Sequence, residues 1–340
     1  MSITLREVAK EAGVSVTTAS RALSGYDDVA ERTRKLVERA ADRLGYVPNL
    51  MARRLKTGRT GTLGFIIPDT SSRLGDPFFS NFIAGVGNEA SLHGFDLLIT
   101  THSPESRGEH ESYTRAVGGG WVDGVILVRT RIDDWRIRYL YENNYPFVAF
   151  GRSNHEFEFP CIDEDSQEGV SQMVQHFIDL GHNEIAFIGP PNNLTFARLR
   201  RTGYIETMEA NNLPWYPEWI REGSMTRKSG YDQMNILLAN RLRPTAVVAG
   251  NDMMAMGVMD AIQERGLVVG KDISVTGFDD VPVSAYTSPP LTTLRQPIYE
   301  IGSQCCRMLV DILAGRQPDP LQVLLTPEPV IRQSTGPKPI

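Results

Sequence analysis

The sequence predicts an all-α head, a helix-turn-helix unit, joined to an α/β body of two doubly wound parallel-sheet lobes. Residues 3–46 contain three short stretches with helical spacing of apolar residues. From residue 62 onward, short apolar runs alternate with helical stretches, which is typical of parallel sheets covered on both faces. The chain has 340 residues, so about 280 remain for the body, too many for one such sheet.

The head is expected to begin with a short amphipathic helix over residues 4–12. Its inner positions are Leu5, Val8, Ala9 and Ala12. Thr4 and Glu7 have the spacing of a capping box. Gly13 ends the helix, because glycine tolerates the left-handed turn. Ser15 is expected to cap a second helix over residues 16–23, which Ser24-Gly25 closes, and such a pair is a helix-turn-helix.

The second helix begins with small side chains, and Arg21 follows one turn later. In a helix-turn-helix, the start of the second helix meets base edges in the major groove. Val16, Thr17 and Thr18 allow close approach, and Arg21 can donate two hydrogen bonds to a guanine. Thr17, Thr18 and Ser20 could also contact phosphates, which carry no sequence information. Local pattern alone leaves an ordinary helical hairpin as an alternative.

The charge distribution favours a DNA-binding head over that alternative. Residues 1–60 contain 12 Lys and Arg against 7 Asp and Glu, although the whole chain has a net charge of −6. A basic head on an acidic body is expected of a DNA-binding module attached to another domain.

A third helix is expected over residues 30–44, ended by Gly45. Its inner face is predicted to consist of Leu36, Val37, Ala40 and Leu44. The segment from Pro48 to Gly58 also has helical spacing, but an isolated helix of this length is unstable in water.

The first 58 residues resemble the lactose/galactose repressor family of transcription regulators. The segments that carry this resemblance are Leu5-Arg6-Glu7-Val8-Ala9, Ala12-Gly13-Val14-Ser15, Thr18-Ala19-Ser20-Arg21-Ala22-Leu23-Ser24 and Pro48 to Gly58. The resemblance implies a DNA-binding domain over residues 1–47 and a hinge over residues 48–60. The hinge helix would fold on DNA, with Leu55 wedged into the minor groove. The implied DNA contacts are Thr4, Ser15, Val16, Thr17, Thr18, Ser20, Arg21, Asn49, Ala52, Arg53, Leu55 and Lys56.

The body is expected to alternate strands and helices from residue 61 to residue 340. Predicted strands cover residues 62–68, 96–101, 123–128, 147–150, 184–188, 246–249 and 273–277, and predicted helices cover 77–93, 106–117, 133–143, 166–180, 194–212, 228–240, 253–265 and 297–314. Lobe one is placed at about 61–160 and 291–325, and lobe two at about 161–290 and the C-terminal segment. Ligands of such sheets bind beyond the carboxyl ends of the strands, where this sequence is polar.

The body resembles the effector-binding domain of the same family, which has the fold of periplasmic sugar-binding proteins. The segments concerned include Asp76-Pro-Phe-Phe, Asp123-Gly-Val-Ile, Leu180-Gly-His, Gly250-Asn-Asp-Met-Met-Ala-Met-Gly, Gly277-Phe-Asp-Asp and Ser288-Pro-Pro-Leu-Thr-Thr-Leu. By this resemblance, Arg200, Asn251 and Asp279 bind a sugar effector across the cleft. The lobe-one candidates are Asp69, Phe78, Phe79, Arg129 and Arg152. The family's lactose-responsive member has a sugar-stacking tryptophan where this chain has Met225.

The resemblance implies a repressor of carbohydrate-utilisation genes. One helix-turn-helix head reads only a half-site, so a homodimer is expected on a palindromic operator. The polar N-terminus favours the cytoplasm, with reduced thiols. No cofactor and no metal site are expected, because the 3 cysteines lack Cys-x-x-Cys spacing. Glycine-rich nucleotide loops and the Gly-x-Ser-x-Gly motif are absent from the sequence, which counts against an enzyme. The absence of an apolar leader counts against an exported transport protein and a membrane partner. Whether effector releases DNA or acts as a purine-like corepressor stays open.

Overall fold

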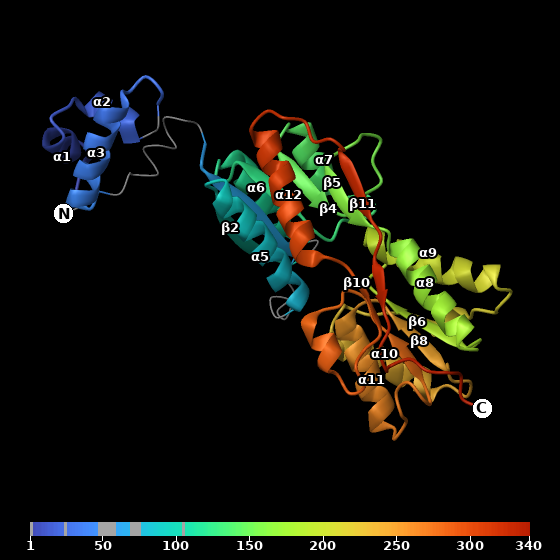
Figure 1. Ribbon diagram of the computed structural model, residues 1–340. Coiled ribbons are helices and arrows are strands. Elements are labelled where there is room, and N and C mark those ends of the chain that lie inside the picture. Colours follow the sequence, from blue (N-terminus) through green and yellow to red (C-terminus); the bar gives the residue numbers. More distant parts are fainter. Residues whose placement is uncertain (1–2, 24–25, 47–58, 69–75, 104–105) are drawn as a thin grey trace. The chain divides into compact units, whose positions relative to one another are not determined.

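The computed structural model describes residues 3–23, 26–46, 59–68, 76–103 and 106–340. The chain divides into two compact units, Met1–Thr60 and Gly61–Ile340, which we call the head and the body (Figure 1). Within the described residues, no helix is long and apolar enough to cross a membrane.

The head contains three helices, α1 (Leu5–Glu11), α2 (Val16–Leu23) and α3 (Glu31–Leu44). The capping box at α1 is present, with the Glu7 carboxylate accepting hydrogen bonds from the Thr4 backbone N–H at 2.7 Å and from its hydroxyl at 2.9 Å. Gly13 has a φ of 66°, as the turn between α1 and α2 requires. The Thr18 N–H donates to Ser15 Oγ at 3.0 Å, which confirms Ser15 as the cap of α2.

One residue of the predicted inner face of α3 lies on the outside. Leu36 is 47 % exposed, whereas Val37, Ala40 and Ala41 are buried against α1 and α2. The prediction for Leu36 was wrong because the buried stripe of α3 is narrow and is centred on residues 37, 40, 41 and 44.

The first part of the body is built on a parallel sheet of six described strands in the order β11-β5-β4-β3-β1-β2. The strands are β1 (Thr62–Pro68), β2 (Asp96–His102), β3 (Gly124–Leu127), β4 (Phe147–Phe150), β5 (Cys161–Glu164) and β11 (Gln322–Leu325). Helices α5 (Pro77–Leu92) and α12 (Ile298–Leu313) cover one face, and α6 (Arg107–Gly118) and α7 (Trp135–Glu142) cover the other. We call this layered unit lobe one.

Lobe two has a smaller parallel sheet of four described strands in the order β7-β6-β8-β9. These strands are β6 (Ile185–Gly189), β7 (Ile220–Glu222), β8 (Ala246–Ala249) and β9 (Ser274–Thr276). Helices α8 (Ser166–Asp179) and α9 (Thr195–Ala210) pack on one face, and α10 (Arg227–Ala239) and α11 (Asp252–Glu264) on the other. Two short 3-10 helices, η2 (Pro217–Trp219) and η3 (Pro282–Tyr286), complete the lobe.

The chain crosses between the lobes after β5, before α12 and after β11. Strands β10 (Thr293–Arg295) and β12 (Glu328–Val330) form a separate antiparallel pair on the latter two crossings. Because β5 pairs with β4, lobe one extends to Glu164, a few residues beyond the predicted boundary. Strands β5, β7, β10, β11 and β12 were not predicted, because each has only 3 or 4 residues and a mixed composition.

Helices α5 and α12 approach each other so closely that only glycine fits at two points. A Cβ on Gly85 would lie 2.0 Å from the Tyr299 carbonyl oxygen, and one on Gly302 would lie 2.4 Å from that of Phe82. The apolar faces at residues 78–86 and 298–313 therefore pack on each other and on the sheet. From the sequence alone, these apolar helix faces are candidates for part of the homodimer surface. That interpretation is wrong for most of their apolar side chains, which are internal.

The α5–α12 contact is also fixed by a carboxylate whose pKa is strongly lowered. Glu89 on α5 accepts hydrogen bonds from Arg307 at 3.0 and 3.1 Å and from Ser303 at 2.8 Å, and the Arg307 guanidinium lowers the pKa of Glu89 to about 2. A carboxylate with a lowered folded-state pKa stabilises the fold above its unfolded pKa and loses that contribution as pH falls.

We therefore expect Glu89→Gln to destabilise the body at neutral pH by roughly 1–3 kcal/mol. The difference from the wild type should shrink as the pH falls from about 4.5 towards 2, where the wild-type carboxylate becomes protonated. Urea unfolding of both proteins at several pH values measures this. A difference that does not change with pH would contradict the role assigned to the charge.

Candidate functional site

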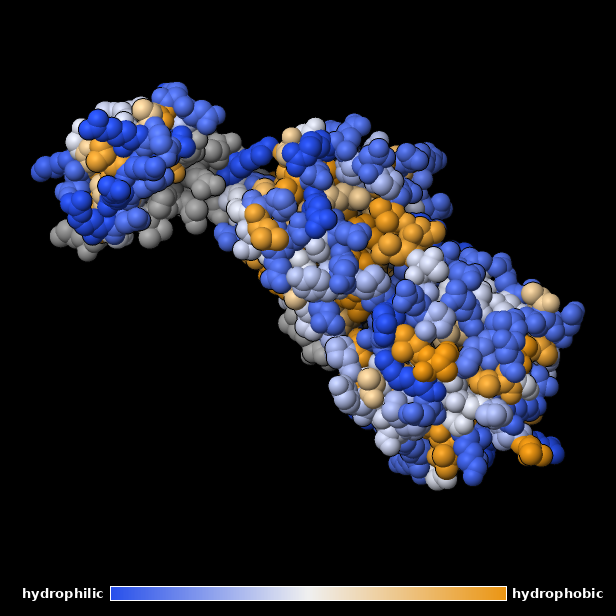
Figure 2. Space-filling model, viewed as in Figure 1, coloured by the Kyte–Doolittle hydropathy of each residue, from blue (hydrophilic) through white to orange (hydrophobic). Residues whose placement is uncertain are grey.

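A cleft of about 520 Å³ lies between the two lobes at the carboxyl ends of their strands. Its lining comes from both lobes: Asp76, Phe78, Arg129, Phe150, Gly151, Asp163, Glu164, Phe196, Arg200, Met225, Asn251, Asp279 and Gln296. On the face shown in Figure 2, hydrophobic residues of the body occur in separate groups among hydrophilic ones.

Arg200 is the central cation of the lobe-two wall. It extends from α9 and is 3 % exposed. Its Nε donates to Ser166 Oγ at 3.2 Å, one terminal nitrogen donates to the Gly250 carbonyl, and the other pairs with the Glu164 carboxylate. The guanidinium also lies over the ring of Phe278, 3.5 Å from its centroid. These contacts hold the guanidinium in one position.

Two further lobe-two residues reach the cleft from strand ends. Asn251 follows β8 and caps α11, with Oδ1 accepting from the Met254 N–H at 3.0 Å. Asp279 follows β9 and accepts from Gln296 Nε2 at 2.5 Å. Burial raises the pKa of Asp279 well above its ordinary value, although Arg200 opposes this shift. Burial likewise raises the pKa of Glu164, again opposed by Arg200.

The lobe-one wall combines an acid, a cation and aromatic rings. Asp76 caps α5 through a 3.1 Å hydrogen bond from the Phe78 N–H, and its other oxygen lies 3.6 Å from an Arg129 nitrogen. Phe78 and Phe150 are stacked with their centroids 6.1 Å apart. Such rings can cover the apolar face of a sugar, while carboxylate, amide and guanidinium groups bind its hydroxyls.

Backbone strain is concentrated at the cleft. Six non-glycine residues in the described parts of the chain have positive φ, and three of them line the cleft: Arg129 at 54°, Met225 at 60° and Asp279 at 118°. Such conformations cost about 1–3 kcal/mol each and persist where the surrounding structure enforces them, commonly at ligand sites. The strain supports the interpretation of the cleft as a binding site.

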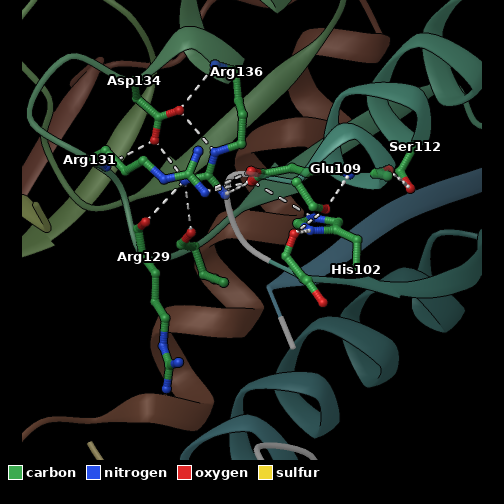
Figure 3. Close-up of polar contacts among 11 residues, drawn as sticks. His102, Glu109, Ser112, Arg129, Arg131, Asp134 and Arg136 are labelled. Carbon is green, nitrogen blue, oxygen red and sulfur yellow. Dashed lines mark hydrogen bonds and ion pairs between the residues drawn. The ribbon is translucent and has the colours of Figure 1, made fainter. Parts of the chain in front are cut away.

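A buried ionic network behind the lobe-one wall fixes the backbone of Arg129. Arg136 pairs with Asp134 and donates to the Arg129 carbonyl at 3.0 Å, and Arg131 donates to both oxygens of Glu109, at 2.7 and 2.8 Å. Figure 3 shows these groups pointing toward one another, with the Arg129 side chain directed away from them. Burial would raise the pKa of Asp134, but Arg136 and the hydrogen bonds lower it below its ordinary value.

The backbone next to this network contacts lobe two at the rim of the cleft. The Thr195 N–H donates to the Thr130 carbonyl at 3.0 Å, and the Ile132 N–H donates to the Asn193 carbonyl at 3.2 Å. Arg131 and Leu194 form an antiparallel bridge between these bonds. The first turn of α9, which carries Phe196, is thereby joined to the loop that carries Arg129.

In the head, the predicted DNA-contacting residues lie mostly at the surface. Thr4, Ser15, Val16 and Thr17 are exposed, and Thr18, Ser20 and Arg21 are partly exposed. Arg21 pairs with Asp28, with its Nε 3.2 Å from Oδ1, and its guanidinium lies 5.2 Å from the centroid of the Tyr26 ring. To contact a base, Arg21 would have to leave Asp28. This exposed ion pair contributes only ~1 kcal/mol or less to stability.

Comparisons with known protein families give one match in the head and one in the body. Residues 4–49 match the family described as "Bacterial regulatory proteins, lacI family", and residues 174–335 match a periplasmic binding protein-like domain. The transcriptional regulator AglR of Rhizobium meliloti is 34 % identical over 100 % of this chain and 96 % of its own length. The chain belongs to the lacI family.

Solved structures of lacI-family proteins match the whole chain. The Lac repressor dimer bound to operator and the anti-inducer ONPF has a TM-score of 0.86 at 29 % identity, covering 99 % of this chain and 100 % of that one. The complex of the regulator CelR with cellobiose has a TM-score of 0.76 at 32 % identity, covering 98 % and 99 %. This lacI-family chain is therefore a DNA-binding transcription regulator and not an enzyme.

The structure brings most of the predicted effector residues together. Phe78, Arg129, Arg200, Asn251 and Asp279 all line the cleft. Phe79 does not, because it is the next residue on α5 after Phe78, points into the core and is fully buried. It supports the site indirectly, with the Arg129 guanidinium 4.7 Å from its ring centroid.

Arg152 also lies outside the lining, because its Nε is bound to Asp163 Oδ2 at 2.5 Å. Asp252 and Asp280 also follow strands, but they do not line the cleft. Both are bound by other groups of the protein. Asp252 accepts from the Val281 N–H at 2.8 Å, and burial raises its pKa to about 7. Asp280 pairs with Arg295 and Arg332.

The sequence analysis did not single out several of the lining residues, among them Phe150, Asp163, Glu164, Phe196 and Gln296. Glu164 and Gln296 border the short strands β5 and β10, which were not predicted, so no strand end pointed to them. Phe196 could have been found from its place in the first turn of α9, one turn before Arg200. Asp69, Asn49, Ala52, Arg53, Leu55 and Lys56 lie outside the described residues.

Proposed function

We propose that this chain is a homodimeric repressor that binds a palindromic operator in the bacterial cytoplasm and changes its affinity when a small sugar occupies the cleft. The observation that carries the proposal is that one chain joins a helix-turn-helix with an exposed α2 start to a strained cleft lined from both lobes. One head reads one half-site, so a palindromic operator requires two chains.

The lining of the cleft supports a sugar as effector. The cleft is lined by aromatic rings together with carboxylate, amide and guanidinium groups. Such a combination suits a sugar ring, which has an apolar face and polar hydroxyls. The related regulator CelR, 32 % identical, was solved with cellobiose. The head should contact DNA through the residues named above, and the hinge over residues 48–60 should bind the minor groove.

The mechanism follows from a ligand that touches both lobes. Arg129 and Phe78 belong to lobe one, and Arg200 and Asp279 belong to lobe two, so such a ligand favours the closed arrangement. It shifts the equilibrium only by its differential affinity for the two arrangements. Because residues 59–62 connect lobe one to the hinge, closure would alter the spacing of the hinge segments of a dimer. Operator binding and effector binding would then each weaken the other, with a coupling free energy of roughly 1–3 kcal/mol.

The proposal is tested by selecting an operator from random duplexes with the full-length chain. Sedimentation should show a dimer, and titration should show two chains per operator. A thermal-shift screen with cellobiose, maltose, raffinose and hypoxanthine would then identify the effector class, and each hit would be added to the DNA complex. A sugar that stabilises the chain and lowers operator affinity supports the proposal. A monomer on DNA, or a response to hypoxanthine alone, contradicts it.

For the head, we expect Arg21→Ala to weaken operator binding by about 1–3 kcal/mol and to leave binding to random DNA nearly unchanged. The expectation rests on the position of Arg21 one turn into α2. Fluorescence anisotropy with labelled operator and scrambled duplex measures both. An equal loss on the two duplexes would make Arg21 a phosphate contact.

Arg34→Ala is a suitable control for this measurement. Arg34 lies on α3 and donates to the Tyr26 carbonyl at 2.8 Å, so it belongs to the same small domain without being on α2. We expect Arg34→Ala to preserve the ratio of operator binding to random-DNA binding.

A further inference from the structure

Two buried acceptor oxygens in the cleft have no hydrogen-bond donor among the described residues: Glu164 Oε2 and Gln296 Oε1. Glu164 is 3 % exposed and Gln296 is 5 % exposed, and both line the cleft. Their neighbouring atoms are satisfied, because Glu164 Oε1 accepts from Ser166 and Arg200 and Gln296 Nε2 donates to Asp279. Leaving a buried acceptor unpaired costs its full desolvation penalty, so a ligand gains most here by supplying donors.

The cations of the cleft already face carboxylates. Each polar nitrogen of Arg200 has a partner, and one of these partners is Glu164. Arg129 lies 3.6 Å from Asp76 and over the Phe79 ring. Glu164 therefore occupies the position at Arg200 that a phosphate or carboxylate of a ligand would need.

The balance of acidic and basic side chains in the lining also disfavours an anion. The lining contains four carboxylate residues against two arginines, Arg129 and Arg200: Asp76, Asp163, Glu164 and Asp279. Arg152, just outside, is bound to Asp163. An anion entering this space would lose its hydration among acidic side chains, and the desolvation penalty would not be offset by a cation in excess of the acids.

We propose that Glu164 makes the cleft selective for an uncharged, hydroxyl-bearing effector and against phosphorylated or carboxylated sugars. Effector hydroxyls donate to Glu164 Oε2 and Gln296 Oε1, and the Glu164 carboxylate keeps anions away from Arg200. This inference rests on the proposed function only in that it uses the same cleft.

The substitution Glu164→Gln provides the sharpest test, because it keeps the shape of the side chain and removes its charge. Arg200 would then lack its carboxylate partner and become available to an anion. The matched control is Glu168→Gln, since Glu168 is an exposed acid on the neighbouring helix α8. The probes are inorganic phosphate, glucose 6-phosphate and the neutral sugars cellobiose, maltose and raffinose.

Thermal shift and calorimetric titration on the full-length chain should show no stabilisation of the wild type or Glu168→Gln by phosphate or glucose 6-phosphate. Glu164→Gln should gain phosphate-dependent stabilisation, and adding Arg200→Ala to it should abolish that gain. Any neutral sugar that binds the wild type should bind Glu164→Gln at least tenfold more weakly.

Stabilisation of the wild type by phosphate or glucose 6-phosphate, lost in Arg200→Ala, would overturn the proposal. So would a folded Glu164→Gln protein, checked by circular dichroism, that gains no anion binding. Operator affinity measured without ligand tests the proposed function independently of these outcomes. A chain that fails to bind operator would refute the repressor, whereas the phosphate response reports on Glu164 alone.

Discussion

Replacing Arg136 with methionine should lower the free energy of unfolding of the body by about 3–5 kcal/mol, the cost of removing one partner from a buried ion pair. Arg136 is fully buried, and its side chain donates to Asp134 and to the Arg129 carbonyl. Methionine fills similar space but leaves the Asp134 carboxylate without its main counter-charge. Urea unfolding followed by tryptophan fluorescence measures the loss, and Trp135 lies next to the site.

Two variants make the result interpretable. Arg138→Met lies two residues further along α7, at an exposed position, and should change stability by less than about 0.5 kcal/mol. Adding Asp134→Asn to Arg136→Met should recover part of the loss, because asparagine can still cap α7 without burying a charge. A loss below about 1 kcal/mol in Arg136→Met, or no recovery in the double variant, would show that the pair is not a stability determinant.

Replacing Asp279 with alanine should remove the response of the DNA complex to the effector concentrations that suffice for the wild type, while leaving operator affinity without effector unchanged. Asp279 lines the cleft from lobe two and accepts a hydrogen bond from Gln296, so its removal takes away an acceptor for the ligand and unpairs a neighbour. Leaving a buried polar group without its partner costs about 1–3 kcal/mol, so effector affinity should fall roughly 5- to 150-fold.

Titrating effector against operator-bound protein measures this effect, with Glu300→Gln as the surface carboxylate control. Asp279→Asn is a second useful variant, because asparagine tolerates the positive φ of 118° better than alanine does. If Asp279→Ala still released DNA at wild-type effector concentrations, Asp279 would not bind effector. If operator affinity itself fell, the substitution would act on the fold instead.

Residues of the cleft could be predicted where they follow a strand that the sequence also predicts. Asn251 and Asp279 could be placed because β8 and β9 are recognisable as buried strands, and the carboxyl ends of parallel strands share one edge. Glu164 could not be placed, because β5 reads as Cys-Ile-Asp-Glu, half acidic, and its burial depends on partners distant in sequence. The sequence also could not tell which of Phe78 and Phe79 faces the cleft, because this depends on the orientation of α5 on the sheet.

The ionic network in lobe one likewise could not be predicted from the sequence. Glu109, Arg131 and Arg136 lie on different elements, and each reads locally as a surface charge. Only the packing of α6 and α7 against the same sheet face buries them together. Leu36 shows the converse case, because an apolar residue at plausible helical spacing remains exposed when no element covers it.

The glycine contacts between paired helices have a consequence for how new specificities can arise. As in the α5–α12 pair, a Cβ on Gly257 of α11 would lie 1.8 Å from the Arg227 carbonyl oxygen, and one on Gly203 of α9 would lie 2.3 Å from that of Gln167. Each lobe thus keeps its helix pairs in fixed register, whereas most of the side chains that line the cleft lie at strand ends, in loops and near the starts of helices. Descendants of this chain can exchange those side chains and acquire a different effector while inheriting the same packing of helices and sheets.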